Sequence, residues 1–369
     1  MGSGIIEEEE EDTVSAQKQG MVFEWYCDHS IVCRWGDHIF ATYGVAMGCA
    51  AATFCATHVA LLRALCAAAV LPSGFACEGF ALLQLVAFLF GGRACSMQLE
   101  DRHVINQSVW RAALRPGMLS SGGQAFWVGT CLATAYACGA AAPWAAALAL
   151  HDATMASFFA MMPLMKVGCV TYGCCWGCEA ARAAWWTTVY TSPHAKVLQA
   201  RADLCGRPLV PTSTLQIALF VATMAAGVLL ARRASTIPVG TLTVVLPWVH
   251  TLINRAVYAM RGEGAPPEIA RFTQQEQRRH RERWTRPLKA LSLAGALSWT
   301  VALSPSVDVV AHLRAVAPAS PASLSLAFLL YATAFGYHRG ALGQWCVRRA
   351  SSRQYQSDRT VHKAHPHTE

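Results

Sequence analysis

Long apolar stretches recur along the chain, and they limit the folds that it can adopt. Of its 369 residues, 54% are hydrophobic and only 14% are charged, whereas soluble domains carry about 25% charged residues. A helix needs about 20 apolar residues to cross a bilayer, and it satisfies its own backbone polar groups there. Stretches of roughly this length cover residues 39–62, 79–97, 126–150, 153–170, 215–231, 238–260, 288–303 and 323–337. The sequence therefore predicts an all-α, polytopic integral membrane protein with seven or eight transmembrane helices.

Composition also divides the chain into segments. Residues 1–37 contain an acidic run at positions 7–12 and are expected to form a mostly disordered tail. Residues 38–304 form the predicted membrane domain, 305–345 an extra C-terminal hydrophobic segment, and 346–369 a basic disordered tail. Most of the 15 cysteines lie singly among apolar residues, where a thiol behaves as a small hydrophobic group. A disulfide framework is therefore not expected.

A lysine stands just before a turn rich in glycine and cysteine, where residues 166–177 read KVGCVTYGCCWG. Because a cation at membrane depth costs roughly 2.5–3.5 kcal/mol, we expect Lys166 to bind an anionic group such as a lipid phosphate. A lysine that snorkels to the interface is the alternative. The thiols of Cys169, Cys174, Cys175 and Cys178 could bind a metal, because Cys175 and Cys178 have the spacing of metal ligands, but a second pair with this spacing is missing. Neither a metal nor another cofactor is therefore expected.

Short motifs stand in or between the apolar stretches, in a fixed order. Tyr43-Gly44 lies in the first, Gly91-Gly92-Arg93 closes the second, Ser121-Gly122-Gly123 forms a turn before the third, and Asp152 opens the fourth. The sixth begins at Gly240 and carries a polar column at helical spacing, His250, Asn254, Tyr258 and Arg261. In order and spacing, from about residue 39 to residue 261, the chain resembles the prolipoprotein diacylglyceryl transferase family of bacterial membranes.

The chain departs from this family at positions that carry the family's chemistry. Ser121 stands where the family has a histidine, and Lys166 where it has an arginine. In the sixth stretch, a tyrosine, an arginine and a glutamate of the family are replaced here, by His250, Asn254 and Tyr258. Arg261 is retained.

The resemblance implies transfer of a diacylglyceryl group from phosphatidylglycerol to a cysteine thiol of a lipoprotein precursor, a step in lipoprotein biosynthesis. The implied catalytic residues are Lys166, His250 and Ser121, and the implied substrate-binding residues are Tyr43, Arg93, Gly122, Gly123, Asn254, Tyr258 and Arg261. Cations would hold the departing phosphate, and His250, or a water that it orients, would take the thiol proton. The implied partners are phosphatidylglycerol or another anionic phospholipid, the precursor peptide and the bilayer, with no nucleic acid.

Two further hypotheses stay open. One is a transferase of the same fold with a different acceptor or donor, and the other is a non-catalytic membrane subunit or lipid-binding protein. For the single residues, the alternative to a site role is an interfacial anchor for Arg93 and a buried hydrogen-bonding residue for His250. In each case we expect a central cavity lined by the first, second, fourth and sixth spans.

Overall fold

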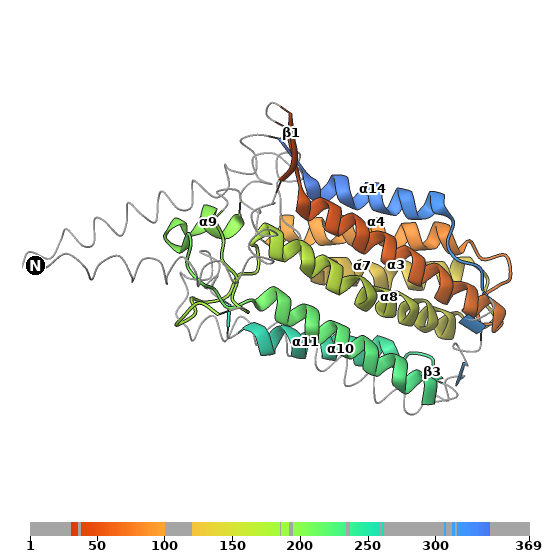
Figure 1. Ribbon diagram of the computed structural model, residues 1–369. Helices are drawn as coiled ribbons and strands as arrows, with labels where there is room; N and C mark the ends of the chain where they lie inside the picture. The colour runs from red at the N-terminus through yellow and green to blue at the C-terminus, as the bar shows by residue number, and fades with distance from the viewer. Residues whose placement is uncertain are drawn as a thin grey trace, which may run out of the picture.

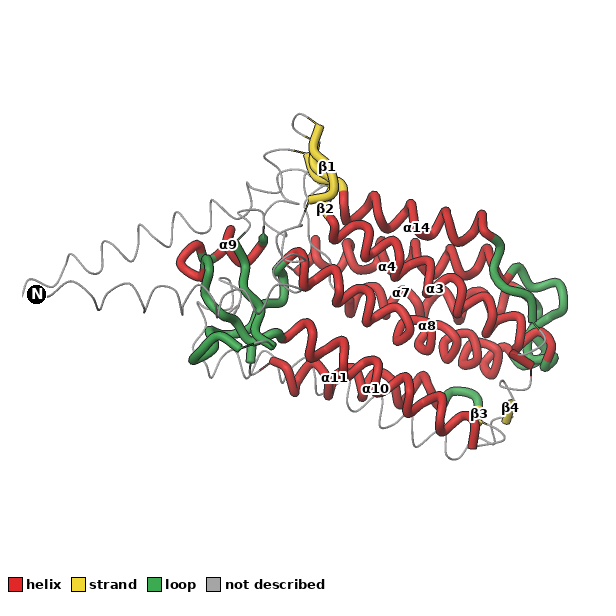
Figure 2. Tube along the Cα trace, in the orientation of Figure 1, coloured by secondary structure: helices red, strands yellow, loops and turns green. Residues whose placement is uncertain are grey.

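The chain folds into a bundle of long helices that run side by side, with loops and short elements at the two ends (Figures 1 and 2). The computed structural model describes residues 31–35, 38–99, 120–184, 186–191, 195–233, 237–258, 260–261, 306–307, 312–313 and 316–339. The α-helices within these ranges are α3 (Thr42–Ala67), α4 (Cys77–Leu99), α7 (Ser120–Ala137), α8 (Pro143–Tyr172), α9 (Lys196–Ala200), α10 (Thr212–Arg233), α11 (Thr241–Tyr258) and α14 (Pro321–Gly336).

The prediction of a helical membrane protein is confirmed in its coarse form. Among the described residues, four helices are long and apolar enough to cross a membrane, and they are α3, α4, α8 and α10. Helix α14 is apolar but shorter, and the predicted span at 288–303 lies outside the described residues. On α10 a run of apolar side chains faces outward, as lipid contact requires: Leu215, Leu219, Val221, Val228, Leu229 and Leu230.

Short strands accompany the helices, which the sequence did not predict. Strands β1 (Ile31–Trp35), β2 (His38–Ala41) and β5 (Tyr337–Arg339) form an antiparallel sheet in the order β1-β2-β5. Strands β3 (Ile237–Pro238) and β4 (Ser306–Val307) form a separate pair. The first sheet therefore joins the chain just before α3 to the chain just after α14.

The predicted boundary between the third and fourth spans is wrong. The sequence placed it at about residue 151, with Asp152 opening the fourth span, whereas the structure ends α7 at Ala137 and begins α8 at Pro143. Hydropathy misses this break because the connecting residues are also apolar. Gly139 has a φ of 65°, which favours glycine, and Pro143 suits the first turn of a helix because it lacks an N–H.

Asp152 instead lies within α8 and ties it to α11. One carboxylate oxygen accepts a hydrogen bond from the Gly240 N–H, and the other accepts from the N–H and the hydroxyl of Thr243, each at 2.6 Å. These N–H groups belong to the start of α11, where a helix leaves donors unpaired. Asp152 therefore acts as an N-cap supplied by a neighbouring helix.

Helix α8 is the centre of the bundle and packs against α3, α7, α10 and α11. Aromatic side chains fill the space between α3, α4, α7 and α8, where Phe54, Phe88, Trp127 and Phe158 are almost completely buried. The Trp127 indole donates a 2.7 Å hydrogen bond to the Gln84 carbonyl. Bulky rings therefore fill the space between these four helices, whereas the predicted central cavity, which also involves the sixth span, stays a prediction.

Glycines set the closest helix contacts. A Cβ added to Gly44 of α3 would lie 2.6 Å from the Ala332 carbonyl oxygen and 2.7 Å from the Gly336 nitrogen of α14. A Cβ on Gly48 would lie 2.8 Å from the Phe328 ring. The C-terminal hydrophobic segment therefore packs directly on the first long helix, backbone against backbone.

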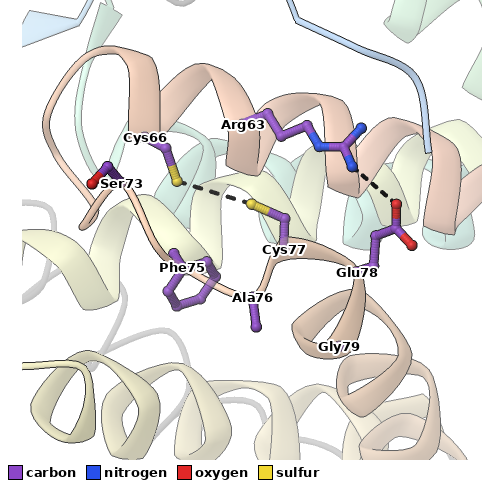
Figure 3. A pocket seen from close by; sticks show the side chains of 8 residues that line it. All are labelled: Arg63, Cys66, Ser73, Phe75, Ala76, Cys77, Glu78 and Gly79. Carbon is purple, nitrogen blue, oxygen red and sulfur yellow. Dashed lines mark hydrogen bonds and ion pairs between the residues drawn. The ribbon is translucent and has the colours of Figure 1, made fainter. Parts of the chain in front are cut away.

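Where α3 ends and α4 begins, Arg63 and Glu78 form an ion pair (Figure 3). Glu78, at the start of α4, accepts hydrogen bonds from Arg63 at 2.9 Å and from the Ser320 hydroxyl at 2.6 Å, and the Ser323 hydroxyl also donates to it. Ser320 is the N-cap of α14. A cavity of about 370 Å³ lies beside this cluster, lined by the end of α3 and the α3–α4 loop.

Candidate functional site

The predicted site residues come from elements that meet at one end of the bundle. The ring of Tyr43, at the start of α3, stacks on the ring of Tyr172, at the end of α8, with centroids 5.0 Å apart. Cys175, in the turn that follows α8, is contacted by Thr212 at the start of α10 and by Arg261, which follows α11. This end of the bundle, with α9 beyond it, is on the left in Figure 1.

Helix α8 ends just before Gly173, whose backbone is in the left-handed conformation, and the turn that follows brings three thiols together. Gly173 has a φ of 63°, and its N–H donates to the Cys169 carbonyl at 2.9 Å. This geometry is a common helix C-cap, which an L-residue adopts only with strain. The reversal brings Cys174 and Cys175 back over Cys169, so that the three sulfur atoms lie within 4.8 Å of one another. We call these three residues the thiol cluster.

Cys175 is held from both sides. Its carbonyl accepts hydrogen bonds from the hydroxyls of Thr212 and Ser213, the latter at 3.3 Å. Its sulfur accepts from Arg261 Nη2 at 3.5 Å and from Cys174 Sγ at 3.9 Å. The thiols of Cys169 and Cys174, followed by the positive charges of Lys166 and Arg261, hold the pKa of Cys175 well below its usual range. Cys175 is therefore the thiol of the cluster that most readily becomes a thiolate.

Lys166 lies one helical turn before the cluster and is half-buried. Within the described part of the chain, no residue forms a hydrogen bond or an ion pair with its ammonium group. Gly168 makes room for Tyr43 nearby, since a Cβ there would lie 2.8 Å from the Tyr43 ring. The structure thus brings Lys166, Arg261 and Tyr43 to one end of α8.

Two residues of the polar column, His250 and Asn254, lie on α11 and form a chain of hydrogen bonds with Gln216. Gln216 Nε2 of α10 donates to Asn254 Oδ1 at 2.9 Å, and Asn254 Nδ2 lies 3.1 Å from His250 Nε2. Because the amide nitrogen is a donor, Nε2 acts as the acceptor. The His250 imidazole is also surrounded by the rings of Phe158, Phe159 and Phe220.

The glycines predicted to bind substrate take part in helix packing. Ser121, Gly122 and Gly123 lie in the first turn of α7 and not in a loop. A Cβ on Gly91 would come within 2.6 Å of the Gly122 carbonyl oxygen, so the backbones of α4 and α7 meet here. Arg93 follows on α4, at the same end of the bundle as Tyr43. The side chains of Ser121 and Tyr258 lie outside the described residues.

The sequence grouped Cys169, Cys174, Cys175 and Cys178 as possible metal ligands, but it did not predict that the first three gather without the fourth. Cys178 is exposed, and its N–H donates to the Met260 carbonyl at 2.8 Å. The hydrogen bond from the fully buried Gln216 to Asn254 was not predicted either.

Comparison with known proteins adds no assignment. No family model matches the chain, and no curated protein matches it.

Proposed function

We propose that the chain is a membrane-embedded, phospholipid-dependent transferase that moves a diacylglyceryl group from phosphatidylglycerol to a cysteine thiol of a lipoprotein precursor. One observation carries the proposal. Lys166 of α8 and Arg261, which follows α11, both place a positive charge near Cys175 at the same end of the bundle. Two cations beside a tyrosine, at the end of apolar helices, suit a phosphate group on a lipid.

The reaction requires a site that stabilises the leaving phosphate and removes the proton of the acceptor thiol. The acceptor thiolate attacks the glyceryl carbon that carries the phosphate, a C–S bond forms, and the C–O bond breaks as glycerol phosphate leaves with the electron pair. Lys166 and Arg261 would stabilise the charge that develops on this leaving group. The thiol proton would pass to His250 or to a water that it orients.

A second candidate function is binding of an anionic phospholipid without chemistry, and the surroundings of His250 favour it. The Nε2 lone pair, which a general base would use, accepts the hydrogen bond from Asn254. Three phenyl rings contact the imidazole. A transferase must break this arrangement or use another base, whereas a lipid-binding protein keeps it unchanged.

A transfer assay tests the proposal. The full chain is placed in phosphatidylcholine vesicles that contain labelled phosphatidylglycerol, together with a lipobox cysteine peptide. We expect label on the peptide, and a rate about 100-fold lower in Lys166→Met and Arg261→Met, since removal of one such donor costs 10²–10³ in rate. Arg255→Met is the matched control, because Arg255 is exposed on α11.

The possible results separate the two candidates. No transfer, with phosphatidylglycerol still bound and lost in Lys166→Met, would replace the transferase by the lipid-binding protein. Equal lipid binding in wild type and both cation variants would overturn the headgroup site itself.

A further inference from the structure

We propose that the thiol cluster binds a thiophilic metal ion, Zn²⁺ or Cu⁺, through the sulfur atoms of Cys169, Cys174 and Cys175. The proposal is independent of lipid chemistry and does not rest on the proposed function. Soft thiolate ligands select these two ions among the common biological metals.

The distances between the sulfur atoms suit one ion. All three lie within 4.8 Å of one another, and Cys174 and Cys175 are 3.9 Å apart. With metal–sulfur bonds of about 2.3 Å, tetrahedral or trigonal coordination separates neighbouring sulfurs by about 3.8–4.0 Å. Small side-chain rotations are therefore enough to close the cluster on a metal.

The backbone holds the ligands in place before any ion arrives. Cys169 belongs to the last turn of α8, and the left-handed turn at Gly173 fixes the path of the next two residues. A Cβ on Gly173 would lie 3.2 Å from both Tyr190 and Val197, so the turn is packed as well as bent. Thr212 and Ser213 anchor the Cys175 carbonyl to α10. A rigid ligand set loses little entropy when it binds.

The surrounding charge favours thiolates, which are the form that binds metal. Three thiolates alone would place three negative charges in a partly buried turn. Arg261 donates to the Cys175 sulfur, and Lys166 adds a second positive charge nearby. Within the described residues, the group that can hold an ion contains only these three cysteines. The ion would then be three-coordinate, as suits Cu⁺, or would keep one position open, as catalytic zinc does.

Metal analysis of the full chain, purified under reducing conditions and without added lipid, tests this site. We expect about one equivalent of zinc or copper per chain, measured by mass spectrometry of the elements. Loading of the chelator-treated protein with Co²⁺ alone should produce a thiolate-to-cobalt charge-transfer band. Both signals should be lost in Cys175→Ser and in Cys174→Ser. The control is Cys138→Ser, a half-buried cysteine in the α7–α8 connection, which should keep both.

Each outcome decides the question. Element analysis names the ion, and Cys138→Ser shows whether loss of any thiol mimics the effect. If a serine variant misfolds, alkylation of the wild type replaces it, since a bound ion should protect these three cysteines and a chelator should expose them. Wild type without metal and without cobalt absorption would overturn the proposal. The proposed lipid site is tested separately, by comparing phosphatidylglycerol binding in wild type and Lys166→Met.

Discussion

At the scale of single residues, Cys175 is the most distinctive group of the chain. Its sulfur accepts hydrogen bonds from neighbouring thiols and from Arg261, and these contacts lower its pKa well below the usual range. The same interactions raise the pKa of Cys174 well above its ordinary value, because Cys169 and Cys175 hold its proton. Of these two neighbouring thiols, Cys175 therefore loses its proton more readily than Cys174.

The lowered pKa of Cys175 predicts how its alkylation depends on pH. Only the thiolate reacts, so a thiol with an ordinary pKa of about 8.5 loses roughly tenfold in rate for each pH unit below that value. In chelator-treated protein, the alkylation rate of Cys175 should fall less steeply below about pH 8 than that of an ordinary thiol. Peptide mapping of iodoacetamide-treated protein measures this, and Arg261→Met should restore a steeper fall. A tenfold loss per pH unit in wild type would contradict the lowered pKa.

At the scale of elements, the contact between α3 and α14 depends on missing side chains. Gly44 and Gly336 face each other backbone to backbone. Cys55, further along the same face of α3, is buried, and its thiol points at the Ser323 carbonyl at 3.9 Å. Helix α14 therefore covers α3 from Gly44 to Cys55.

Gly44→Ala should push these helices apart. The new Cβ would meet backbone atoms, which cannot rotate away, so we expect a loss of about 1–3 kcal/mol or more, as for other overpacked interiors. Thermal unfolding in detergent measures the loss, and faster maleimide labelling of Cys55 locates it. Gly227→Ala on α10 is the control, because a Cβ there meets nothing within 4 Å. An unchanged melting point in Gly44→Ala would show that the helices do not pack this closely.

The sequence predicted the helices well and their contacts poorly. Hydropathy located α3, α4 and α10, since it depends only on local composition. It missed the break between α7 and α8, because Gly139 acts through its backbone conformation. The same limit applies at the site. Gly122 looked like part of a turn, yet its function in the fold depends on Gly91, 31 positions away, which pattern alone does not reveal.

At the scale of the whole molecule, the two ends of the bundle differ in chemistry. One end carries Lys166, Arg261 and the thiol cluster, and the other carries Arg63, Glu78 and the cavity at the α3–α4 loop. If the bundle axis crosses the membrane, each end meets a different compartment.

This arrangement predicts a sidedness of labelling. Cys33, Cys178 and Cys205 are exposed and belong to segments at the thiol-cluster end. In sealed, uniformly oriented vesicles, a membrane-impermeant maleimide should label all three from the same side. A cysteine introduced by Ser73→Cys, at an exposed position in the α3–α4 loop, should react only from the other side. Labelling of Cys33 and Cys205 from opposite sides would contradict a bundle that crosses the membrane along its axis.

The pairing of α3 with α14 also governs how the protein is made. Cys55 and Ser323 are 268 positions apart in the chain, and ribosomes add about 5–20 residues per second. The first long helix therefore waits roughly 13–54 s for the helix that covers its glycine face. During that interval the glycine face of α3 is accessible to chaperones, to other nascent helices and to membrane proteases. A product that ends before Pro321 lacks α14 and leaves this face of α3 uncovered.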